Sequence, residues 1–133
     1  MNDIIFIPKE VIIYLQKQLI LNYGGTHGIR DENLLDSAIE QPKVTFDEKY
    51  LHDSIIKIAA AYGYYLCKNH PFIDGNKRIA LVAMDIFLQR NGFEIIANEK
   101  DMYNLIMELA SGNLSKDSLV NWLENNTTAL TNS

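Results

Sequence analysis

Two stretches near the middle of the chain, residues 54–67 and 79–88, are almost entirely apolar. Each would place apolar side chains on every side of a helix, which is typical of a helix buried inside a protein. Pro71 disfavours helical geometry at the residue before it, and Gly75 relaxes the backbone before the second stretch. The pattern therefore predicts a central antiparallel pair of helices joined by one short loop.

Apolar residues at helical spacing predict four further helices around this pair. Pro8 suits the first turn of the first of them, and Asp31 suits the N-cap of the second. In chain order, the four helices begin at Pro8, at Asp31, near Glu99 and near Ser115. The predicted fold class is all-α, a compact bundle of about six helices.

The segment 41–50 is the least helical part of the first half. Val44, Thr45 and Phe46 favour extended structure, so a short β-hairpin and a plain loop both fit it. Residues 93–96 are also expected to be extended. The length of 133 residues suits one domain, which we place at residues 1–126, followed by a flexible C-terminal tail at 127–133.

The loop between the central helices carries residues suited to binding a phosphate. Free N–H groups at the start of a helix attract anions, and a nearby guanidinium or ammonium adds positive charge. Cations at this end oppose the helix dipole, so a bound phosphate explains them better than the helix does. The candidate phosphate-binding or nucleotide-binding residues are Gly75, Asn76, Lys77 and Arg78.

The same loop contains a candidate base, a candidate metal ligand and an anchor. The imidazole of His70 is the side chain best suited to accept a proton near neutral pH. Asp74 can ligate a Mg²⁺ ion that also contacts phosphate oxygens, because magnesium usually takes one or two protein carboxylates. Phe72 can hold the loop against the core. Purely structural roles for these residues are possible individually, and a zinc site is disfavoured because Cys67 is the only thiol.

Composition narrows the class of partner. The net charge is −5, which argues against direct binding of nucleic acid along its phosphate backbone. No apolar run is long enough to span a membrane and no leader pattern is present at residue 1, so we expect a cytoplasmic protein. Cys67 is expected to be buried and inert. His27 and His52 are interpreted as solvated side chains, and the glycine-rich segment 24–28 as a turn.

The stretch His70-Pro71-Phe72-Ile73-Asp74-Gly75-Asn76-Lys77-Arg78 resembles the signature of the Fic/Doc family, in the form found in its Doc ("death on curing") branch. The resemblance covers most of residues 4–125. Other segments that look like Doc-type toxins are Tyr23-Gly24-Gly25, Gly28-Ile29-Arg30-Asp31, Leu34-Leu35-Asp36-Ser37-Ala38 and Arg90-Asn91-Gly92.

The resemblance implies a toxin that uses ATP and Mg²⁺ to modify a hydroxyl of a target protein. Fic-type members transfer AMP, whereas the Doc branch, with lysine at the position of Lys77, transfers the γ-phosphate. Leu81 replaces a second arginine of the longer motif, which weakens the AMP-transfer interpretation. A translation elongation factor is the implied target and arrest of translation the implied outcome. A Fic-type AMP-transferase, or a non-catalytic homologue that binds only a nucleotide or an antitoxin, remains the alternative.

The resemblance also implies two structural features. A hairpin in the segment 41–50 would be the family's flap, pairing with the target's main chain beside the active site. The autoinhibitory helix of some family members has no clear counterpart here. Val120 stands at the position where that helix requires a hydroxyl side chain. The helix that carries Val120 and Glu124 is therefore interpreted as an ordinary last helix. Inhibition should come instead from an antitoxin that binds in a groove.

Overall fold

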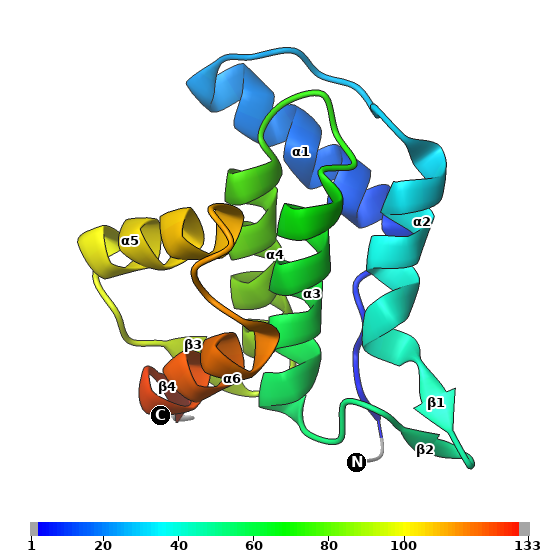
Figure 1. The fold of residues 1–133 in the computed structure, drawn as a ribbon, viewed down its shortest axis with the longest axis vertical. Helices are drawn as coiled ribbons and strands as arrows, with labels where there is room; N and C mark the ends of the chain where they lie inside the picture. The colour runs from blue at the N-terminus through cyan, green and yellow to red at the C-terminus, as the bar shows by residue number, and fades with distance from the viewer. Residues whose placement is uncertain (1–2, 131–133) are drawn as a thin grey trace.

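The computed structural model describes residues 3–130, which form six α-helices and two small antiparallel strand pairs (Figure 1). The predicted all-α class is confirmed. In chain order the elements are α1 (Lys9–Tyr23), α2 (Glu32–Glu40), the short 3-10 helix η1 (Gln41–Lys43), β1 (Thr45–Phe46), β2 (Lys49–Tyr50), α3 (Ile55–Asn69), α4 (Asn76–Arg90), β3 (Phe93–Ile95), α5 (Glu99–Ala110), α6 (Lys116–Asn125) and β4 (Thr127–Ala129). Between residues 3 and 130, no helix has both the length and the apolar character needed to cross a membrane.

The predicted central pair is confirmed as α3 and α4, which lie side by side through the middle of the molecule (Figure 1). Gly63 permits the close approach, because a Cβ at that position would lie 2.3 Å from the Sδ of buried Met84. Tyr62 is fully buried and its hydroxyl accepts a 3.0 Å hydrogen bond from the N–H of Ile7. Burial raises the pKa of Tyr62 to about 12. The pair therefore forms the rigid support of the loop that joins it.

Local capping fixes where several helices begin. In each case a side-chain oxygen accepts a hydrogen bond from the N–H three residues later, which satisfies one of the free donors of the first turn. The expected N-cap at Asp31 and the expected start near Ser115 are confirmed. The residues that cap helices in this way are Asp31, Ser54, Asn98 and Ser115.

A β-hairpin, one of the two structures that fit the segment 41–50, forms there, but it does not lie beside the motif at residues 70–78. Thr45 pairs with Tyr50 and Phe46 with Lys49. The hairpin precedes the N-terminus of α3, whereas the motif follows its C-terminus, and a 15-residue helix is about 22 Å long. Figure 1 shows the two at opposite ends of the molecule. The expectation that this hairpin lies beside the candidate site at residues 70–78 is therefore wrong.

The end of the described chain also differs from the prediction. Residues 127–133 were expected to be a flexible tail, yet β4 pairs with β3 in antiparallel register. Backbone hydrogen bonding, which no side-chain periodicity reveals, holds this segment to β3. Residues 131–133 lie outside the described part of the chain.

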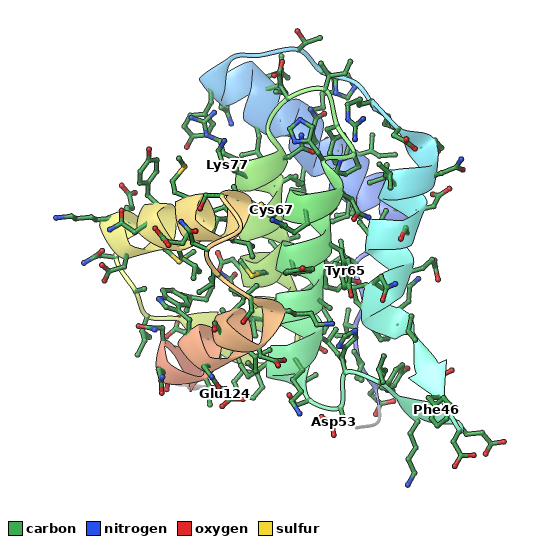
Figure 2. All side chains as sticks on the ribbon, in the orientation of Figure 1. Phe46, Asp53, Tyr65, Cys67, Lys77 and Glu124 are labelled. Carbon is green, nitrogen blue, oxygen red and sulfur yellow. The ribbon has the colours of Figure 1, made fainter. Side chains whose placement is uncertain are left out.

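The last helix is an ordinary packing element, as predicted. Leu119 and Leu123 of α6 are fully buried, and α6 packs on α3. Figure 2 shows Lys77 in the upper half of the molecule and Glu124 in the lower half, well apart. The α6 helix is therefore not placed to block the motif.

Candidate functional site

A cavity of about 650 Å³ lies between the motif loop and α5. This volume falls within the range of roughly 300–1,000 Å³ that is usual for small-molecule sites. Every candidate residue of the motif except Phe72 lines it. The lining residues are Cys67, Lys68, His70, Ile73, Asp74, Gly75, Asn76, Lys77, Arg78, Leu81, Tyr103, Ile106, Met107 and Ala110.

His70 is the residue at which α3 ends. It adopts left-handed backbone geometry, with φ 50° and ψ 53°, which is costly for a residue that has a Cβ. Pro71 explains why α3 cannot continue, since its ring disfavours right-handed helical geometry at the preceding residue. The side chain of His70 is exposed and lines the cavity, so a substrate can reach it.

The turn into α4 presents unpaired backbone donors to the same cavity. Gly75 is the N-cap, at φ 78°, a conformation that a side chain would make unfavourable. The first N–H groups of α4 have no acceptor within the helix. The side chain of Asn76 is already used, because its Oδ1 accepts from the N–H of Phe72 at 2.9 Å and its Nδ2 donates to the oxygen of Phe72 at 3.0 Å. The side-chain oxygen and one side-chain N–H of Asn76 are therefore occupied, and its backbone N–H remains available to an anion.

Phe72 lies outside the cavity and inside the core. Its side chain is fully buried in the same apolar cluster as residues of α3 and α4. Because Asn76 holds its backbone from both sides, Phe72 links the loop to the core through its side chain and to α4 through its main chain.

Positive charge is concentrated around the cavity, although the whole chain carries a net charge of −5. Lys68, Lys77 and Arg78 line it, against the single carboxylate of Asp74. The guanidinium of Arg78 lies 4.3 Å from the ring centroid of Tyr23, at the end of α1, which is cation–π geometry. Sequence reasoning did not include Lys68, which comes from the end of α3.

Asp74 is held by the segment that follows α1. Its Oδ2 accepts a 2.7 Å hydrogen bond from the N–H of Thr26, and its backbone oxygen accepts one of 3.1 Å from Nε2 of Gln16. Because the amide nitrogen of Gln16 donates, its Oε1 must accept from Nδ1 of His27, 2.7 Å away. This network fixes the carboxylate without neutralising it.

The donor set around Asp74 suits a magnesium ion shared with phosphate. No group of three or more His, Cys, Asp or Glu side chains suited to holding a metal occurs between residues 3 and 130. A fully protein-bound metal would need such a group, whereas magnesium commonly takes one carboxylate, waters and substrate phosphates. Asp74 fits that second arrangement.

The segment 24–31 was predicted to begin with a turn, and it lies directly against the motif loop. Ile29 forms a β-bridge with Phe72, and the N–H of Ile73 donates to the oxygen of Gly28 at 3.0 Å. A Cβ on Gly25 would lie 3.2 Å from the Cβ of Asp74, so the glycine allows the two loops to touch. No local pattern predicts this contact.

The opposite wall of the cavity comes from α5, which sequence reasoning treated only as a core helix. Ile106 is buried, whereas Tyr103 is 61% exposed and Met107 is 38% exposed. The two exposed side chains are four residues apart and therefore share one face of α5. Tyr103 and Met107 thus form a second apolar stripe on α5, separate from the stripe that packs in the core. This second stripe was the feature of the sequence that could have indicated a cavity wall.

The remaining expectations about single residues had mixed outcomes. Cys67 is buried, as predicted, and burial raises the pKa of its thiol. His27 is exposed, as predicted, but it also joins the network around Asp74. The prediction for His52 is wrong, because its side chain is only 7% exposed and its Nε2 has no hydrogen-bond partner among the described residues. Packing against the rest of the fold, not local polarity, decides its burial.

Comparison with known proteins agrees with the motif and the fold. The model of the Fic/DOC family matches residues 6–88, which include the whole motif. The chain is 32% identical over 116 residues to Toxin Doc of Mycolicibacterium smegmatis, covering 80% of this chain and 87% of that protein. It is 29% identical over 119 residues to Protein kinase doc of Escherichia phage P1, covering 88% and 91%. The chain therefore belongs to the Fic/DOC family.

Proposed function

We propose that the protein is a Doc-type toxin that transfers the γ-phosphate of ATP to a hydroxyl of a target protein. One observation carries the proposal: a single cavity brings together an accessible imidazole, one fixed carboxylate, a helix N-terminus and three cationic side chains. The names of the two relatives, a Doc toxin and a Doc protein kinase, support the same class.

Each group has a part in the reaction. The N–H groups at the start of α4, together with Lys77 and Arg78, bind the phosphates of ATP. His70 accepts the proton of the attacking hydroxyl while the hydroxyl oxygen forms a bond to the γ-phosphorus. The bond from the γ-phosphorus to the bridging oxygen then breaks, and ADP leaves. Positioning and charge stabilisation supply most of the catalysis in such reactions.

Magnesium would be held by Asp74 together with the phosphates of the bound nucleotide. It would supply neutralisation of the negative charge that develops on the transferred group. Asp74 itself needs only to keep its carboxylate aimed at the cavity. Thr26 and Gln16 provide that restraint through the two hydrogen bonds at Asp74.

Lys77 favours γ-phosphate transfer over AMP transfer. In the family's AMP-transferring form a glycine stands at this position, which lets the nucleotide approach the backbone closely. Here a long charged side chain lines the cavity instead, and Leu81 replaces a second arginine. Both features support an orientation of ATP in which the γ-phosphate, and not the α-phosphate, faces the attacking hydroxyl.

The biological context of the proposal is a toxin–antitoxin pair in the cytoplasm. The target would be a translation elongation factor, so that its modification arrests protein synthesis. An antitoxin would restrain the toxin by covering the cavity. The exposed apolar side chains Tyr103 and Met107, which line the cavity, are suited to an amphipathic helix from such a partner.

Labelled ATP tests the proposal directly. The purified protein is incubated with cell extract and with ATP that carries the label at either the α- or the γ-phosphorus. We expect label to reach protein only from the γ position, and His70→Ala to abolish the transfer. Label from the α position would instead establish the AMP-transferase. Absence of any transfer, together with no growth arrest on expression of the wild type, would establish a non-catalytic homologue.

A further inference from the structure

The inference concerns Arg30, which directly precedes Asp31, the N-cap of α2. Its guanidinium contacts the backbone where α3 ends. Nε donates a 2.7 Å hydrogen bond to the backbone oxygen of His70, and Nη2 donates one of 3.1 Å to the backbone oxygen of Asn69. The ion pairs among the described residues all use lysines.

The main chain around Arg30 also donates hydrogen bonds to the same loop, at the residue that follows His70. The N–H groups of Arg30 and of the next residue, Asp31, both donate to the backbone oxygen of Pro71, at 2.8 and 3.1 Å. One residue and its neighbour thus supply donors to three consecutive carbonyls, at positions 69, 70 and 71. His70 is the middle one.

These carbonyls need such donors. The last carbonyls of an α-helix have no partner within the helix, and the end of α3 carries the negative pole of its dipole. A guanidinium satisfies two of them at once with a rigid, planar fork. The contacts also stabilise the left-handed geometry of His70, which a residue with a Cβ adopts reluctantly.

The backbone angles of His70 decide where its imidazole lies, because they set the direction of the bond from Cα to Cβ. We propose that Arg30 is a positioning residue, which holds the main chain of His70 so that the ring faces the cavity. The inference rests on the proposed role of His70 as the base. Asn69 strengthens the arrangement, since its Nδ2 donates to the oxygen of Leu34 at 3.0 Å and ties the end of α3 to α2.

Three variants separate positioning from general stability. Arg30→Gln removes the charge and the fork, and Arg30→Lys keeps the charge but not the fork. Arg90→Gln is the matched control, because Arg90 is an exposed arginine at the far end of α4. Each purified variant is assayed for transfer as a function of ATP concentration. The proton resonances of the His70 ring are recorded by NMR, assigned with His70→Ala, and thermal unfolding is measured in parallel.

We expect Arg30→Gln to lower kcat by about 10–100-fold while the KM for ATP stays within about twofold, because a misplaced catalytic group costs rate more than binding. Arg30→Lys should recover part of the loss. The His70 resonances should shift in Arg30→Gln and not in Arg90→Gln. Added ethylguanidinium should partly restore activity to an Arg30→Gly variant.

Two results would overturn the positioning role. The first is Arg30→Gln with wild-type kcat and unshifted His70 resonances. The second is a loss of rate that follows only the unfolded fraction and that Arg30→Lys does not relieve. Failure of the proposed function can be distinguished from failure of the positioning role. If the proposed function is wrong, the wild-type protein itself transfers AMP or transfers nothing. The NMR comparison still reports in that case whether Arg30 orients the His70 ring.

Discussion

The backbone N–H of Thr26 donates a 2.7 Å hydrogen bond to Oδ2 of Asp74, across 48 residues of sequence. This contact shows how the loop after α1 serves the motif between α3 and α4. It holds one oxygen of the carboxylate and leaves the charge available to a cation. The role of Asp74 in the proposed reaction can therefore be tested separately from its role in folding.

Asp74→Asn should weaken the binding of magnesium while keeping the fold. The asparagine side-chain oxygen can still accept from Thr26, but the negative charge is lost. We expect the transfer rate to fall by about 10–100-fold and to recover partly as the magnesium concentration rises. A magnesium titration at saturating ATP measures this. Asp53→Asn, which removes only a surface pair with Lys57, is the control and should match the wild type. Equal magnesium curves for all three proteins would exclude Asp74 as a ligand.

His70→Ala and Phe72→Ala should fail in different ways. His70 is the proposed base, so its loss should abolish growth arrest. Because its side chain is exposed, the yield of soluble protein should not fall. Phe72 is fully buried, and truncating such a side chain costs about 3–5 kcal/mol of unfolding free energy. Growth on induction and chemical denaturation of the purified variants measure the two effects. A stable Phe72→Ala protein would show that the loop does not depend on its core anchor.

Gly63→Ala should destabilise the central pair of helices. The added methyl would lie 2.3 Å from the Sδ of Met84, so one of the two helices or the buried Met84 side chain must move. Overpacking of this kind costs about 1–3 kcal/mol. Urea unfolding should show a lower midpoint, and Gly63→Ala combined with Met84→Ala should lose less stability than the sum of the single changes. An unchanged midpoint in Gly63→Ala would mean that the helices are less tightly packed than the structure indicates.

The burial of His52 should make stability depend on pH. Desolvation lowers the pKa of His52 in the folded protein, with a further contribution from Lys116. The unfolded chain then binds a proton first as the pH falls, so stability is complete above about pH 6.5 and is lost as the pH drops from there towards the lowered folded pKa. Unfolding free energies measured between pH 7.5 and pH 5.5 should decline more steeply for the wild type than for His52→Gln. Parallel slopes would contradict the shift.

Local rules in the sequence predicted most of the helical framework and the motif. Asp31 was expected as a cap and is one, and Pro71 was expected to end α3 near His70 and does. The apolar stretches before and after the motif became the buried pair. These features were predictable because capping, proline sterics and helical periodicity act over a few residues.

The composition of the site beyond the motif was decided only by the tertiary structure. Arg30 reaches His70 across 40 residues, and Tyr103 and Met107 close the cavity from a helix that follows the motif. The residues of the segment 41–50 fitted a hairpin and a plain loop equally, and only the structure shows that the two strands pair. Contacts of this range depend on how separate helices pack against one another, and no pattern within a single segment records that packing.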